Sequence, residues 1–307
     1  MNTSEKFSPP AFNLVLRDRP RLVQGVTASI RANVVTCVTA PTGSGKSALL
    51  HQVMDAWNAE GEADRCIWFG CDHFDREARR FVALLERAVA GIPPEAPSGR
   101  SPIETLMSAN DPKGVADAIV AGGRRVVLFL DNFHLCDDDE TARALDILIA
   151  ECRGMLHPVI SSRRATRLAL GHLRMRGLVG EFEAQDLAFT PDEARDLIGH
   201  ECQADDDAVD RIIERTEGWA VALQLVRMLA RAGAGLRVLS KEFSGADQDI
   251  GQFLNEEVLR TLPAAMRDFL LSICPLDRFS ASLAEAVSLR PDARVLFEEM
   301  KERNLFV

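Results

Sequence analysis

The feature that most constrains this chain is the stretch Val34–Leu50, VVTCVTAPTGSGKSALL, in which an apolar run, a loop of small residues and a helical pattern follow one another. Short runs rich in β-branched residues are typical of strands buried on both faces of a parallel sheet. Gly43 and Gly45 lack a Cβ and tolerate positive φ, so the loop can turn its backbone N–H groups toward an anion. The sequence therefore predicts a phosphate-binding loop between a strand and a helix.

The residues after these glycines have the chemistry that such a loop needs. We expect Lys46 to reach the β- and γ-phosphates as a point charge, and the Ser47 hydroxyl to ligate Mg²⁺. The usual pattern, G-x-x-x-x-G-K-[ST], has its first glycine where this chain has Ala40. That departure weakens the motif taken alone, and a chance glycine- and serine-rich turn before a helix is the alternative interpretation.

Composition limits the classes of function. The 307 residues suffice for two or three domains, and the formal net charge of −10 argues against nonspecific nucleic-acid binding by the whole surface. No apolar stretch reaches the length of a membrane span, and the N-terminus has no signal-peptide pattern. The seven cysteines are scattered and include no C-x-x-C pair. We therefore expect reduced thiols in a cytoplasmic protein, without disulfides or a zinc site.

Strand-like runs and helical patterns alternate through the first 186 residues. We expect a disordered lead-in, Met1–Pro10, and then a helical stretch to about Arg31. Arg19, just before that helix, is a candidate contact for the nucleotide base, and a solvated helix start is the alternative. The remaining expected elements of this part are the strands Val34–Val38, Cys66–Gly70, Arg124–Asp131 and His157–Ile160, and a proline-rich loop, Gly91–Pro102.

The third strand-like run ends in an acid, which fits the second half of a nucleotide site. At the carboxyl end of a buried parallel strand, Asp131 can hold the water shell of Mg²⁺, although it would also serve as a plain cap of the next loop. Asn132 follows where many P-loop enzymes have a carboxylate that orients or deprotonates water. Because a neutral amide cannot accept that proton, we expect catalysis involving Asp131 and Asn132 to be slow or absent.

Charged residues near the other strand ends have two possible interpretations. Arg163, directly after the fourth strand, is a candidate sensor of the γ-phosphate, and a surface arginine is the alternative. The acidic run Asp137–Glu140 predicts a solvated helix N-terminus. His134 is a lone loop histidine, for which a structural role is the usual one.

From Leu187 onward the pattern is entirely helical. Thr190 and Glu193, separated by Pro191, predict a capping box at a helix start. Later helices are expected at Asp205–Arg215, at Trp219–Ala232, before a glycine-rich stretch Ala232–Gly235, and within Ile250–Leu289, whose three helices are typical of a helix-turn-helix core. The last of these three, Ser282–Leu289, carries no Lys or Arg, so we expect an interdomain clamp rather than a DNA reader.

Several motifs occur in a fixed order, namely APTGSGKSALL, LFLDNFHL, SSR, GHLRMRGLVGEFEAQDLAFTPDEARDLI, RTEGWAVALQLV, FLNEEVLRTLPAAMRDFLLSICPLDRF and FEEMKERNLFV. Their order and spacing resemble the ATP-binding front half of the large LuxR-type (MalT-like) transcriptional regulators, which are signal-transduction ATPases with numerous domains. The resemblance implies an α/β P-loop NTPase domain with a parallel sheet over residues 1–186. It further implies a helical lid domain over 187–245 and a winged-helix domain over 246–307. Because Asn304–Val307 resembles the first strand of the wing, we expect that domain to be incomplete. The chain would then be either part of a longer protein or a degenerate relative of the family.

The resemblance also implies functional residues. It places phosphate contacts on Gly43, Ser44, Gly45, Lys46, Ser47 and Ala48, with Ser47 and Asp131 at the metal. Arg163 becomes the sensor, and Gly218-Trp219-Ala220 a contact from the helical domain to the nucleotide, although packing is the ordinary role of a residue such as Trp219. The family commonly has a second acid where Asn132 stands and an aromatic hydroxyl where Phe133 stands.

The leading hypothesis is an adenine-nucleotide switch, binding ATP or ADP with Mg²⁺ and self-associating in the ATP state, with DNA bound only through a C-terminal domain absent here. The rival is a P-loop ATPase of metabolic or motor type with fast turnover. Direct DNA binding by these residues is a third possibility, which the acidic charge disfavours. No membrane partner is expected.

Overall fold

The computed structural model describes residues 5–10, 17–61, 64–90, 111–202, 206–231, 262–274, 276 and 280–302. The chain forms two compact units, the first made of Met1–Ala40 with Lys46–Leu187 and the second of Pro41–Gly45 with Ala188–Val307. The expected loop Gly91–Pro102, the glycine-rich stretch Ala232–Gly235 and the expected wing strand lie outside the described residues. In the part of the chain that is described, no helix is both long enough and apolar enough to cross a bilayer.

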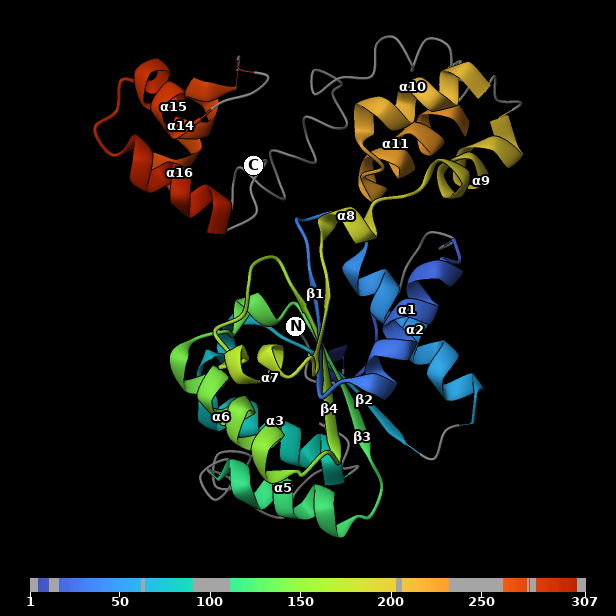
Figure 1. Cartoon of the computed structure of the whole chain (residues 1–307), viewed down its shortest axis with the longest axis vertical. Coiled ribbons are helices and arrows are strands. Elements are labelled where there is room, and N and C mark those ends of the chain that lie inside the picture. Colours follow the sequence, from blue (N-terminus) through green and yellow to red (C-terminus); the bar gives the residue numbers. More distant parts are fainter. Residues whose placement is uncertain are drawn as a thin grey trace. The chain divides into compact units, whose positions relative to one another are not determined.

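The first unit is built on a sheet of five parallel strands in the order β2-β3-β4-β1-β5 (Figure 1). The strands are β1 (Val35–Thr39), β2 (Arg65–Gly70), β3 (Val126–Asp131), β4 (Leu156–Ser162) and β5 (Val179–Phe182). The first four confirm the strands expected from apolar runs. β5 was not anticipated, because an edge strand that is only half-buried needs no continuous apolar sequence.

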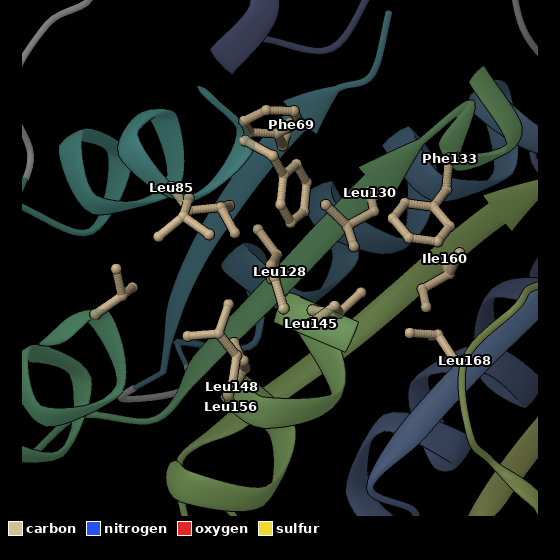
Figure 2. Packing of buried hydrophobic residues seen from close by; sticks show 14 of the residues in the cluster. Phe69, Leu85, Leu128, Leu130, Phe133, Leu145, Leu148, Leu156, Ile160 and Leu168 are labelled. Atoms are coloured by element: carbon tan, nitrogen blue, oxygen red, sulfur yellow. The ribbon is translucent and has the colours of Figure 1, made fainter. Parts of the chain in front are cut away.

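Helices cover both faces of this sheet (Figure 1). The helices α1 (Pro20–Ala32) and α2 (Lys46–Ala59) share a buried cluster with one face, whereas α3 (Ala78–Ala90), α5 (Pro112–Ala121) and α6 (Asp139–Glu151) share a cluster with the other. All six residues of β3 are buried, and its five apolar residues alternate between the two clusters. Leu128 and Leu130 pack with Leu145 of α6 (Figure 2), whereas Val127 and Phe129 join the α1 and α2 side. The result is the α/β fold with a parallel sheet that the sequence predicts.

The N-terminal segment differs from the expectation of a disordered lead-in. Glu5–Phe7 forms a 3-10 turn in which Lys6 is 1% exposed. The Lys6 ammonium donates to Asp72 at 2.7 Å and to Asp75 at 2.6 Å, and the Phe7 ring lies edge-on to Phe69, 5.8 Å between centroids. The prediction is therefore wrong for residues 5–10, because two carboxylates beyond β2 pair with the one lysine of the segment.

The second unit contains two helical clusters, each with its own apolar core. One comprises α9 (Pro191–Cys202), α10 (Asp206–Thr216) and α11 (Ala220–Arg231), and the other comprises α14 (Ala264–Ile273), α15 (Ala281–Ser288) and α16 (Ala293–Glu302). The predicted capping box at α9 is confirmed, since the Thr190 N–H donates to Glu193 Oε2 at 3.0 Å and the Glu193 N–H donates to Thr190 Oγ1 at 3.2 Å.

Candidate functional site

The first turn of α2 and the end of β3 come together in the first unit. The Ser47 hydroxyl donates to Asp131 Oδ1 at 2.9 Å, and Asp131 is 4% exposed. The sequence predicts this juxtaposition, because β1 and β3 are parallel and both lead into the same edge of the sheet. The pair offers a hydroxyl and a carboxylate oxygen side by side.

Two further residues fix the Asp131 carboxylate. Ser161, at the end of β4, donates its hydroxyl to Asp131 Oδ1 at 2.5 Å, and the Asn132 side-chain amide donates to Oδ2 at 3.3 Å. The Asn132 backbone is left-handed, with φ 56°, and its N–H donates to Ser161 Oγ at 2.9 Å. The sequence marked Asn132 only as a missing acid and did not assign Ser161 any role, although it follows an apolar strand in the motif SSR.

This arrangement suits a magnesium ion. Mg²⁺ takes oxygen ligands, keeps several waters and is held through one or two protein groups plus substrate phosphates. Among the described residues no three His, Cys, Asp or Glu side chains gather as a metal site. Ser47 and Asp131 thus fit an ion whose remaining ligands come from water and phosphate, and they do not fit an all-protein cage.

Lys46 precedes Ser47 and is buried, being 7% exposed. Its ammonium donates to the Ala40 carbonyl at 2.7 Å. Burial, followed by repulsion from Arg163, lowers the pKa of Lys46 to about 7, and the Asp131 charge opposes that shift. A cation held at this cost in a low-dielectric setting would be stabilised by an added anion.

The loop Pro41–Gly45 belongs to the second unit. Gly43 has φ 76° and Gly45 has φ 83°, which is the positive-φ geometry that the sequence predicts, and Ser44 is 7% exposed. The Trp219 indole N–H donates to the Thr42 carbonyl at 3.1 Å. Trp219 therefore lies against the backbone of the loop, and its expected contact with a nucleotide stays a prediction.

The cations expected at the site have different surroundings. Arg163 directly follows β4, and its charge acts on Lys46 and on His134. Burial and then Arg163 lower the pKa of His134 to about 3, so this imidazole is neutral. Its Nδ1 is buried and has no hydrogen-bond partner among the described residues. The sensor role of Arg163 stays a prediction.

Arg19 occupies the N-cap position of α1 without a side-chain capping bond, and it is 6% exposed. Its Nη1 donates to the carbonyl of Leu187 at 2.7 Å, at the end of the short helix α8 (Ala184–Leu187). The alternative of a solvated helix start is therefore wrong for Arg19. Contact with a base stays a prediction.

The acidic run before α6 is only partly solvated. Asp137 is 4% exposed and accepts the Arg167 N–H at 3.2 Å on each oxygen, and burial raises its pKa to about 6. The next residue, Asp138, caps α6 by accepting the Thr141 N–H at 2.8 Å. The expectation of a solvated run is thus wrong for Asp137, whose carboxylate accepts a hydrogen bond from the backbone of the segment that follows β4.

Known proteins resemble this chain in sequence and in fold. Residues 255–307 match the family model described as the MalT winged helix domain. Serine/threonine-protein kinase PknK of Mycobacterium tuberculosis is 28% identical over 316 residues, which cover 99% of this chain and 28% of that protein. The HTH-type transcriptional regulator MalT of Serratia proteamaculans is 27% identical over 305 residues, covering 96% of this chain and 32% of the regulator.

Among solved structures, a Walker-type ATPase of Pyrococcus abyssi aligns with a TM-score of 0.60 at 16% identity, covering 98% of this chain and 93% of that one. This likeness shows the P-loop ATPase fold. The similarity to MalT confirms the resemblance that the motifs indicate. The chain spans less than a third of the length of the curated relatives named above.

Proposed function

We propose that this chain is the nucleotide-controlled switch module of a MalT-like transcriptional regulator, and that it binds ATP or ADP with Mg²⁺. The observation that carries the proposal is the Ser47 hydroxyl placed 2.9 Å from the Asp131 carboxylate, with the buried Lys46 ammonium one residue away in the chain. Similarity to MalT along nearly the whole chain supports a transcriptional regulator.

Each residue has a role that its chemistry supports. The backbone N–H groups of Gly43–Ala48 and the Lys46 ammonium would bind the phosphates. Ser47 and Asp131 would hold the metal, which when bound neutralises phosphate charge. Arg163 would contact the γ-phosphate, and Arg19 would lie nearer the rest of the nucleotide.

The switch follows from the difference between two ligands. ATP and ADP can shift an equilibrium only through contacts that differ between them, and the γ-phosphate is that difference. In the proposed cycle, ADP holds the domains closed, whereas ATP together with an inducer bound elsewhere opens them and permits self-association. DNA binding is assigned to a C-terminal domain outside these 307 residues, in a cytoplasmic protein.

Hydrolysis is expected to be slow. The Asn132 amide donates to Asp131 and cannot take a proton from water, so the site lacks a carboxylate base at this position. The rival function, a metabolic or motor ATPase, predicts turnover of about 10 per second. Steady-state phosphate release separates the two, because a rate in that range would overturn the switch.

Nucleotide identity tests the proposal most directly. The purified protein is denatured, and any released adenine nucleotide is identified and counted. ATP and ADP binding to the Lys46→Ala variant is then compared with wild type. Unchanged affinity for both nucleotides would show that the phosphate site lies elsewhere.

A further inference from the structure

The start of helix α11 binds the phosphate loop through the loop's own backbone. Two consecutive carbonyls of the loop accept hydrogen bonds, that of Thr42 from the Trp219 indole at 3.1 Å and that of Gly43 from the Val221 N–H at 3.0 Å. Val221 lies in the first turn of α11, where backbone N–H groups have no partner within the helix. The Gly43 carbonyl thus satisfies a backbone donor that the helix leaves open.

Peptide geometry gives these contacts a consequence for the other side of the loop. In a trans peptide the C=O and the next N–H point in opposite directions, and the described chain has no cis bond. When the carbonyls of Thr42 and Gly43 point toward α11, the N–H groups of Gly43 and Ser44 point away from it. Outward carbonyls and inward N–H groups are the arrangement that an anion-binding loop requires.

Side chains of α11 also contact the loop. A Cβ added to Gly43 would lie 2.8 Å from Val221 Cγ1, closer than such atoms approach, and 3.1 Å from Trp219 Cζ2, a tight contact. At Gly45 the nearest atom to an added Cβ is the Ala220 Cβ, at an ordinary 3.7 Å. Gly43 is therefore the point of tight packing.

The start of α11 is itself held firmly. Gly218 has φ 71°, and its carbonyl accepts the Phe189 N–H at 2.9 Å. A Cβ at Gly218 would meet the Phe189 carbonyl oxygen at 2.5 Å, so only glycine fits there. The Trp219 N–H completes the turn by donating to Thr216 O at 2.8 Å. A rigid turn therefore presents Trp219 and Val221 to the loop.

We propose that Trp219 and Val221 are positioning residues that hold the phosphate loop in its anion-binding shape before any nucleotide arrives. They act through the loop backbone and not by touching the nucleotide. This inference rests on the proposed nucleotide binding, and it differs from the direct contact to the nucleotide that the sequence resemblance implies for Trp219.

The first experiment distinguishes a residue that positions the phosphate loop from one that contacts the base of the nucleotide. Trp219→Phe removes the indole donor, and affinity is measured by calorimetry for Mg-ATP and for Mg-tripolyphosphate, which has neither base nor ribose. If Trp219 acts through the loop, both ligands should bind about three- to tenfold more weakly, as expected for one hydrogen bond. Weaker binding of ATP alone would overturn the proposal in favour of a base contact, and unchanged binding of both would overturn it outright.

A matched control is available in α2. Trp57 is 1% exposed and its indole nitrogen has no hydrogen-bond partner among the described residues, so Trp57→Phe should leave both affinities unchanged. Thermal melts of both variants check that the fold is retained. A wild-type protein that binds neither ligand would refute the proposed function itself. That result is distinct from the outcomes that would refute only the positioning role of Trp219.

A second set of variants keeps the inference testable if Trp219→Phe does not fold. Gly43→Ala and Gly45→Ala both place a side chain at positive φ, but only the first meets Val221. Adding Val221→Ala should restore part of the tripolyphosphate affinity lost in Gly43→Ala and none of that lost in Gly45→Ala. Equal rescue of both, or of neither, would contradict the packing of α11 on the loop.

Discussion

For the proposed nucleotide site, the buried Lys46 predicts that affinity depends on pH in a defined direction. In the free protein, burial and the charge of Arg163 lower its pKa to about 7 from 10.5, which disfavours the ammonium by on the order of 5 kcal/mol. Bound phosphate favours the ammonium, so the pKa rises on binding. Between these two pKa values, binding ATP must therefore take up a proton.

The expected size follows from that linkage. Below about pH 7 the lysine is already charged and contributes no pH dependence to affinity. Above pH 7, affinity should approach a fall of about tenfold per pH unit, so that affinity at pH 9 is about fiftyfold weaker than at pH 7. The nucleotide's own phosphates titrate mainly below this window, which keeps the signal assignable to the protein.

Calorimetry in buffers of different ionisation enthalpy measures the proton directly. At pH 8.5 we expect uptake approaching one proton per ATP, falling toward zero at pH 6. Lys46→Arg provides the control, since arginine stays charged throughout, and whatever affinity it retains should show no uptake. Binding of ATP to wild type at pH 8.5 without proton uptake would refute the reasoning.

Three further predictions concern other parts of the first unit. Asn132→Asp supplies a proton acceptor and should raise steady-state hydrolysis; it also sets a second carboxylate near Asp131, so without Mg²⁺ the melting temperature should fall. An unchanged rate would place the base elsewhere. Lys6→Met removes the ammonium shared by Asp72 and the buried Asp75, leaving Asp75 only its 3.5 Å pair with Arg80, and should destabilise by about 3–5 kcal/mol in denaturant unfolding. Arg195→Ala is the control, because it breaks ion pairs at the surface and should cost less than about 1 kcal/mol of stability. Equal losses of stability in the two variants would contradict the stabilising role of the buried Lys6. His157 is fully buried, with its pKa lowered to about 3, so the unfolded chain binds a proton there that the native one does not. Its contribution to stability should therefore fall as pH drops from 6.5 to 3, and His157→Gln should flatten that slope in urea titrations.

The sequence predicts those features whose cause is local. A strand buried on both faces is typically a near-continuous apolar run, which is why β3 could be placed from its residues Val126–Leu130 alone. The capping box of α9 needs only Thr190 and Glu193 in their order along the chain. Positive φ at Gly43 and Gly45 follows from the loop motif in the same way.

Features that depend on distant partners could not be predicted. In the sequence, Lys6 belongs to a polar lead-in, and no local pattern indicates that Asp72 and Asp75 lie beside it in the fold. Asp137 reads as a helix cap, and only the fold brings the Arg167 backbone to it. Trp219 lies 177 residues beyond Thr42, and no local pattern indicates that its indole binds a carbonyl of the loop.

The neutral residue after Asp131 connects the geometry of the site with slow chemistry. Ser161 and Asn132 donate to the carboxylate from their own positions, so its orientation does not depend on a bound metal. Ser47 donates its proton to the same carboxylate, which leaves the oxygen lone pairs of its hydroxyl available to a cation. A site arranged in this way is ready to bind, because little ordering remains to be done when nucleotide and metal arrive. Without a carboxylate at position 132, the same site has no evident base to activate water. In the proposed function, preformed binding combined with slow hydrolysis would produce long-lived nucleotide states, which a regulator that reports its bound nucleotide requires.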